Sequence, residues 1–169
     1  MKKLTYAVCC LTLASATAFA PSLKAQATDQ DKQFLTNASQ GNYDEIQLGK
    51  LAEQKATNPS VKAFGQRMVR DHTMLTEKMK PFATSWGINP PTALSPEAQK
   101  EYDKLQGLSG KDFDKEYIDD MVTDHTKDLD EFTKEVKDTK DAKFKVAVEQ
   151  GKSVVAAHKN MAYSLKKKL

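Results

Sequence analysis

Four long stretches of the sequence place apolar residues at alternating steps of four and three positions, and this spacing limits the possible folds most strongly. These stretches are residues 31–56, 59–86, 109–138 and 141–168. Such alternation puts the apolar side chains on one stripe of a helix, where they pack against neighbouring helices. The β-branched runs typical of strands are missing. The sequence therefore predicts an all-α four-helix bundle.

Proline, glycine and capping residues indicate where these helices begin and end. Asn58 followed by Pro59 is typical of an N-cap and a first helical position. Pro81 is expected to kink or end the second helix, although the apolar spacing continues beyond it. A short extra helix is expected in the longer connection between the second and third long helices. Ser109, with Asp112 three residues later, predicts a capping box for the third.

Residues 1–27 have the features of a secretory signal peptide, which makes 28–169 the bundle domain. Two lysines precede an apolar run rich in small residues, and small residues stand at the −3 and −1 positions for cleavage after Ala27. A membrane anchor is the alternative, but a run of about 17 residues is short for a span. Both cysteines, Cys9 and Cys10, lie in this segment. We therefore expect a periplasmic or outer-envelope protein without a thiol or a transmembrane span in its mature chain.

The charge of the mature chain argues against nucleic acid as a partner. Three of the 26 basic residues lie in residues 1–27, which contain no acid, so 23 basic and 23 acidic residues remain. A nucleic-acid-binding protein uses an excess of cations to displace counterions. The sequence points to no particular protein partner or oligomeric state.

Four polar residues interrupt the apolar stripes, one on each long helix. They are Glu45, His72, His125 and His158, and each lies near the middle of its helix. They can therefore share one layer of the bundle. Three neutral imidazoles and a carboxylate suit a transition metal such as zinc, iron or copper. A metal-free polar network that fixes helix register would use the same residues, so the two interpretations stay open.

A repeated pattern, Met-Val-x-Asp-His-Thr, surrounds two of these histidines and begins at Met68 and again at Met121. It predicts similar surroundings for both rings. Asp71 and Asp124 lie one position off the stripe, where they are either exposed or hydrogen-bonded to a metal ligand. The two methionines precede each histidine by four residues on the same face. A thioether suits copper, but core packing is the more common role of methionine in such a stripe.

Several segments of the chain resemble the bacterial exported ferritin-like family known as domain of unknown function 4142, often labelled outer-membrane or periplasmic proteins. The resemblance is carried by Glu45–Ala52, Val61–His72, Ser109–Tyr117, His125 and His158. It implies a ferritin-like bundle in the cell envelope and supports Glu45 and the three histidines as shared polar positions. It implies no activity.

The sequence departs from ferritin-like enzymes in one respect. Their di-iron centres use Glu-x-x-His on two helices, whereas Val69, Val122 and Val155 stand three residues before the histidines here. A di-iron oxidase is therefore not expected, and a binding or structural role is favoured over an enzyme. Our hypothesis is an exported bundle with a mononuclear Glu/His metal site. The alternative is a metal-free envelope stress or interaction module.

Overall fold

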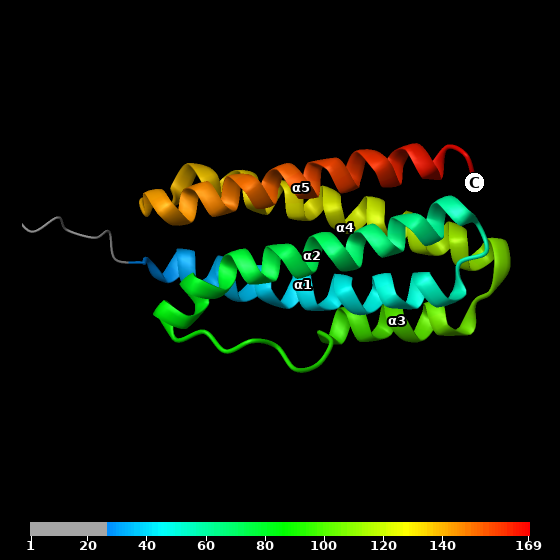
Figure 1. Ribbon diagram of the computed structural model, residues 1–169, viewed down its shortest axis with the longest axis horizontal. Coiled ribbons are helices and arrows are strands. Elements are labelled where there is room, and N and C mark those ends of the chain that lie inside the picture. Colours follow the sequence, from blue (N-terminus) through cyan, green and yellow to red (C-terminus); the bar gives the residue numbers. More distant parts are fainter. Residues whose placement is uncertain (1–26) are drawn as a thin grey trace, which may run out of the picture.

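The computed structural model describes residues 27–169, which form five helices and no strand. The four long helices are α1 (Asp29–Lys55), α2 (Pro59–Trp86), α4 (Gly110–Asp138) and α5 (Ala142–Lys166), and the short one is α3 (Pro96–Gly107). The long helices lie along one axis, and α3 lies outside them beside α1 (Figure 1). The predicted all-α bundle with a short extra helix is thus confirmed. The predicted signal peptide lies outside the described residues, apart from its last position.

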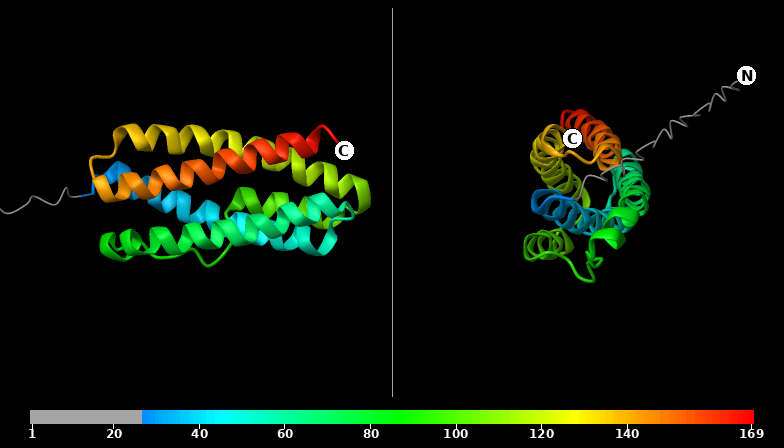
Figure 2. Two further views of the ribbon diagram at one scale, coloured as in Figure 1. Left: turned by 45° about the horizontal axis from the view of Figure 1, so that its top comes forward. Right: turned by 90° about the vertical axis from the view of Figure 1, so that its left-hand side faces the viewer.

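The four long helices form two hairpins that face each other. α1 packs mainly against α2, and α4 packs mainly against α5. Between the hairpins, α2 faces α5 and α1 faces α4 through fewer contacts. The end-on view in Figure 2 shows the four long helices around a common axis, with α3 on the outside. None of the helices in residues 27–169 combines the length and apolarity that a membrane span requires.

Helix α2 begins as predicted but does not end at its internal proline. The Asn58 side chain accepts a hydrogen bond from the Ser60 N–H, and Pro59 is the first helical residue. The helix then continues through Pro81 to Trp86. The reason lies in packing, because the Trp86 ring meets the Phe144 ring of α5 with centroids 4.7 Å apart. This aromatic contact holds the last turn of α2 in place despite the missing N–H of the proline.

The capping box predicted for α4 is wrong. Ser109 is the N-cap residue, but its side chain makes no capping hydrogen bond. Gly110 follows with φ of 60°, so the chain enters the helix through a left-handed residue, for which glycine is suited. Asp114 in the same helix instead accepts hydrogen bonds from the N–H groups of Thr57 and Asn58 in the α1–α2 turn.

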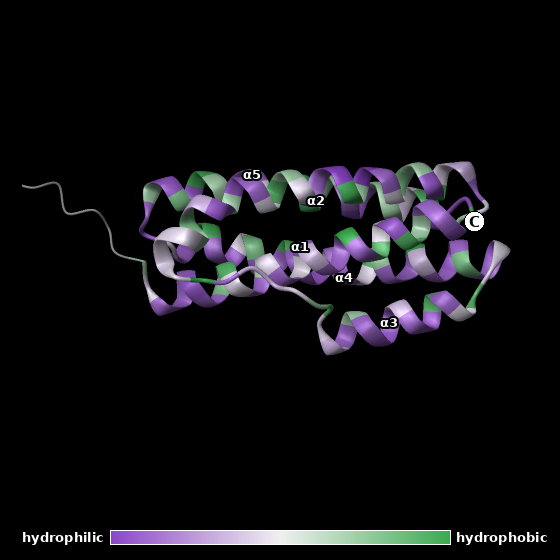
Figure 3. Cartoon of the chain, turned by 60° about the horizontal axis from the view of Figure 1, so that its bottom comes forward, coloured by the Kyte–Doolittle hydropathy of each residue, from purple (hydrophilic) through white to green (hydrophobic). Residues whose placement is uncertain are grey.

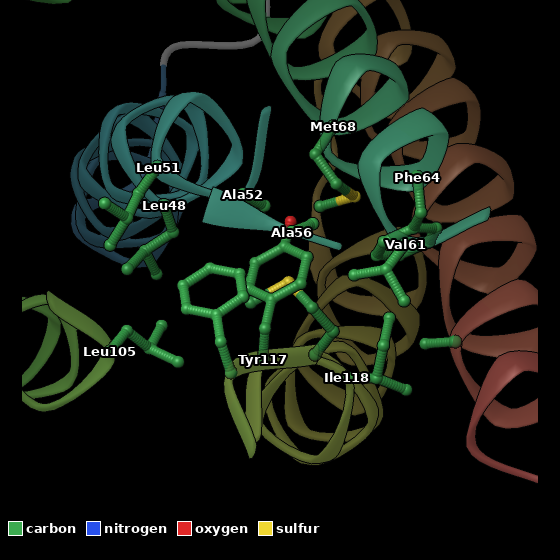
Figure 4. Packing of buried hydrophobic residues seen from close by; sticks show 13 residues of the cluster. Leu48, Leu51, Ala52, Ala56, Val61, Phe64, Met68, Leu105, Tyr117 and Ile118 are labelled. Atoms are coloured by element: carbon green, nitrogen blue, oxygen red, sulfur yellow. The ribbon is translucent and has the colours of Figure 1, made fainter. Parts of the chain in front are cut away.

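Two apolar clusters fill the bundle on either side of its middle. One contains Tyr117, Met68 and Phe64 and lies toward the α1–α2 turn, where its side chains point toward one another (Figure 4). The other contains Phe34, Phe132 and other residues toward the α4–α5 turn. Hydrophilic residues alternate with apolar ones along every helix, as amphipathic helices require (Figure 3). On α2, α4 and α5 the histidine stands in sequence between the residues of the two clusters.

Candidate metal centre

The structure brings the three histidines together in the middle of the bundle. His72 comes from α2, His125 from α4 and His158 from α5, and all three are buried. One ring nitrogen of each lies within 4.8 Å of one ring nitrogen of the other two. The ring centroids are 5.2–5.8 Å apart. This is the separation expected of side chains that could share one metal ion.

Hydrogen bonds fix the tautomers of His72 and His125. Nδ1 of His72 lies 2.8 Å from the side-chain oxygen of Asn42, and Nδ1 of His125 lies 3.0 Å from the carbonyl oxygen of Met121. Both oxygens only accept hydrogen bonds, so each Nδ1 carries a proton and donates it. Each Nε2 therefore bears a free lone pair.

The third ring is turned the other way. Nε2 of His158 lies 2.9 Å from a carboxylate oxygen of Asp71 and donates to it, which leaves the lone pair on Nδ1. This Nδ1 and the two Nε2 atoms are buried and have no hydrogen-bond partner in the described part of the chain. Buried polar atoms are nearly always paired, because an unpaired one costs free energy. Three unpaired lone pairs, one from each ring, are the arrangement that a metal ion would satisfy.

The environment keeps all three imidazoles neutral. Burial lowers the pKa of His72 far below its ordinary value, and the other two rings lower it further. Burial, with repulsion from His158, lowers the pKa of His125 to about 3. The pKa of His158 is also lowered by burial, although Asp71 opposes that shift. Neutral imidazole is the form that binds metals.

Asp71 supports the site from outside the triad. Its carboxylate also accepts hydrogen bonds from Nε of Arg67 at 3.0 Å and from Nε of Arg70 at 3.1 Å. Burial would raise the pKa of Asp71, but the contact with His158 and the two arginines lowers it overall. The carboxylate is therefore charged, and it can hold the imidazole in one orientation and increase its basicity.

Glu45 lies beside the triad and is not part of it. Its carboxyl is buried, and one oxygen lies 3.6 Å from Nδ1 of His125, the nitrogen that donates to Met121. The other oxygen is buried without a partner. Burial, followed by repulsion from Asp128 and Asp124, raises the pKa of Glu45 far above its ordinary value. The expected layer of four polar residues thus holds three converging rings with a buried carboxyl next to one of them.

The two halves of the repeated pattern have the same local structure but different partners. Both threonines donate to the carbonyl four residues earlier, and Met68 and Met121 are both buried in the same apolar cluster. Asp71 accepts a hydrogen bond from His158, which is one of the two roles predicted for this residue. Asp124 is partly buried and makes no hydrogen bond to any of the three histidines.

Asn42 is the site residue that the sequence analysis missed. It is buried on α1, three residues before Glu45 and so on the same side of the helix. A second polar residue on an inward face was the available signal. It was overlooked because asparagine is also common on exposed faces.

Comparisons with known proteins agree on the family and the fold. The family model described as "Domain of unknown function (DUF4142)" matches residues 16–165, so the chain belongs to this family. The crystal structure of a DUF305 fragment from Deinococcus radiodurans is similar, with a TM-score of 0.74 and 14% identity, covering 85% of this chain and 99% of that one. CopM in the Cu(I)-bound form is also similar, with a TM-score of 0.69 and 22% identity, covering 85% and 98%. No curated protein matches.

Proposed function

We propose that this DUF4142 protein binds one transition-metal ion through His72, His125 and His158. The observation that carries the proposal is the set of three buried lone pairs, one on each ring. Each ring is held by a hydrogen bond from its other nitrogen, and the three rings come from three helices. Metal-binding histidines are typically held in this way by an acceptor on the far nitrogen. A hydrogen-bonded network without metal would instead pair these nitrogens with donors of the protein.

The donor set favours a d¹⁰ ion, Cu(I) first and zinc second. Imidazole suits zinc, copper and iron, whereas calcium and magnesium prefer oxygen ligands. The three rings are neutral and add no charge, so a monovalent ion is less costly to bury here than a divalent one. The structural similarity to a protein described in a Cu(I)-bound form is consistent with this choice. Zinc would keep a fourth position for another ligand.

Binding, buffering or delivery of the ion is the role we propose, without turnover. The valines three residues before each histidine supply none of the bridging carboxylates that di-iron oxidases use. Glu45 is available next to His125 as a nearby acid and is not needed as a ligand.

Metal analysis of protein purified without a histidine tag tests the proposal. We expect one equivalent of copper or zinc per chain after titration with Cu(I) under anaerobic conditions or with Zn²⁺. His72→Gln, His125→Gln and His158→Gln should each abolish stoichiometric binding. Met68→Leu with Met121→Leu is the matched control, and it should retain the ion if the imidazoles are the ligands. Failure of the unaltered protein to retain either ion would refute the proposal.

Export to the cell envelope is part of the proposal. Thr28, the first residue after the expected cleavage position, is the N-cap of α1, and its side chain and that of Asp31 form a capping box. Cleavage after Ala27 would thus leave the whole helix with its cap. Mass spectrometry of the protein expressed in a bacterium with its full sequence should find a mature chain that begins at Thr28. A chain that keeps residues 1–27 would contradict cleavage.

A further inference from the structure

A cavity of about 40 Å³ lies between α1 and α4, and its lining extends from one ring of the candidate metal centre to an exposed side chain. Its inner end includes His72 and the hydrogen-bond partner of that ring, Asn42. Its outer end includes Asp128 and the exposed Glu131. A space of this volume has room for at least one water molecule. It is therefore large enough for an ion that has lost most of its hydration shell.

Gly41 lines this cavity, and helix packing does not explain why it is glycine. A Cβ atom at position 41 would meet nothing within 4 Å. At Gly65, by contrast, a Cβ would lie 2.8 Å from Cβ of Ala52 on the neighbouring helix. Glycine in a helix interior is less stable than alanine. What Gly41 provides is open space beside the cavity.

The charges at the surface distinguish this cavity from the other opening near the triad. Burial, followed by repulsion from the carboxylates of Asp124 and Glu131, raises the pKa of Asp128 to about 7, although Lys127 opposes the shift. Lys127 also lies 4.0 Å from Glu131. Even with this lysine, acids predominate at the mouth, and a cation arriving there would relieve their repulsion.

The second opening is a groove between α2 and α5. Its floor includes Phe64, whose ring meets His158 edge-on with centroids 6.3 Å apart. Arg67 and Arg70 line it. The carboxylate of Asp71 pairs with both arginines and offsets one of their two charges. The remaining positive charge repels a metal cation, so the groove is electrostatically unfavourable for its approach.

We infer that the metal ion enters and leaves the histidine triad through the cavity between α1 and α4, past Asn42 and His72. Gly41 keeps this route open, and Asp128 and Glu131 attract the cation to its mouth. The inference rests on the proposed function, since it assigns the access route of that same site.

Filling the cavity tests the route. Gly41→Leu places a side chain beside the cavity without a backbone penalty, and Gly107→Leu, at another glycine whose Cβ would meet nothing, is the matched control. Metal-free protein is mixed with Cu(I) or Zn²⁺, a strong chelator stops uptake at set times, and the retained ion is counted. Release is measured from loaded protein with the same chelator. We expect Gly41→Leu to slow uptake and release of the ion by about tenfold or more. The Kd should stay unchanged, because the substitution alters only the energy barrier along the route.

A second variant leaves the interior untouched. Glu131→Gln should slow uptake at low salt, and the difference should disappear at high salt, where surface charges are screened. Glu149→Gln, at an exposed acid of α5, is the control and should have no effect. Unchanged uptake rates in Gly41→Leu and Glu131→Gln would overturn the route, as would a change in Kd that comes from release alone. Unaltered protein that retains no ion would instead overturn the proposed function.

Discussion

His72 and His125 occupy the same place in a repeated pattern, yet their rings are held by different acceptors. Nδ1 of His72 donates to a side chain on α1, whereas Nδ1 of His125 donates to the carbonyl of Met121 in its own helix. His158, outside the full pattern, donates to a carboxylate. A carboxylate acceptor makes a stronger, charge-assisted hydrogen bond than a neutral oxygen does. His158 is therefore the ring whose orientation depends most on a single neighbouring residue.

Replacing that neighbour should weaken metal binding without removing a ligand. Asp71→Asn can present its amide nitrogen to Nε2 of His158, which would move the ring proton to Nδ1 and block the lone pair. We expect the metal affinity to fall by about 10- to 100-fold. Competition titration with a chelator of known affinity measures the change.

The repeat supplies the matched control for this variant. Asp124→Asn makes the same chemical change at the equivalent position, where no histidine is contacted, and should leave the affinity unchanged. Equal effects of Asp71→Asn and Asp124→Asn would mean that overall charge, and not the hydrogen bond to His158, controls affinity.

The sequence could predict which residues lie near the centre but not which ring nitrogen each presents. The position of a residue in an apolar stripe fixes its height along the helix to within about 1.5 Å. This precision is sufficient to predict that the three histidines lie at a similar height. The acceptor that turns each ring depends on side-chain rotamers and on neighbouring helices. For this reason Asn42 was missed, and Glu45 was expected among the ligands although it lies beside Nδ1 of His125.

At the scale of helices, close backbone approach joins α1 to α2. A Cβ at Gly65 would lie 2.8 Å from Cβ of Ala52 and 3.0 Å from the carbonyl oxygen of Gly49, and neither atom can move aside easily. The backbone and Cβ atoms of α1 are therefore the neighbours that require glycine at position 65.

Gly65→Ala should therefore destabilise the bundle by about 1–3 kcal/mol, the usual cost of an overpacked interior. Gly41→Ala, with free space at its Cβ, should be stabilising by about 0.5–1 kcal/mol. Urea unfolding followed by circular dichroism gives both values. Equal effects of the two substitutions would show that helix propensity alone, and not contact between α1 and α2, decides the outcome.

Helix α3 is held to α4 in part by two acids. Burial and the carboxylate of Asp120 raise the pKa of Glu101 to about 8, and burial raises that of Asp120 to about 6. The pKa of a glutamate in the unfolded chain is about 4.3. Between pH values of about 4.3 and about 8, the folded chain therefore binds more protons at Glu101 than the unfolded chain does. For this reason the contribution of Glu101 to the free energy of unfolding falls as pH rises through this range.

Glu101→Gln should make stability depend less on pH. Glutamine can still donate to Asp120 but does not titrate, so the variant should lose less stability than the unaltered protein between pH 5 and pH 8. Urea unfolding across that range checks the slope, with exposed Glu97→Gln on the same helix as the control. An unchanged slope would contradict the assignment of the pair as a pH-dependent link.

At the scale of the whole molecule, the candidate centre lies between the two hairpins. The two hairpins are each closely packed, and fewer contacts join one hairpin to the other. His72 belongs to the first hairpin, and His125 and His158 belong to the second. A bound ion would link the hairpins at mid-height, between the two apolar clusters. Its effect on stability should therefore exceed that of any single surface contact.

Thermal melting measures this link directly. An ion that binds only the folded chain stabilises it by about 2.7 kcal/mol at a free concentration 100 times Kd, which corresponds to a rise in Tm of several degrees for a domain of this size. We expect Tm to rise with the concentration of Cu(I) or Zn²⁺ and to return on chelation. The combined variant His72→Gln, His125→Gln and His158→Gln should show no rise, because no ligand remains to join the hairpins, whereas Met68→Leu should respond fully. A rise in Tm of equal size in the combined variant would mean that the ion binds elsewhere on the protein. The stabilisation of the bundle would then not depend on the three histidines.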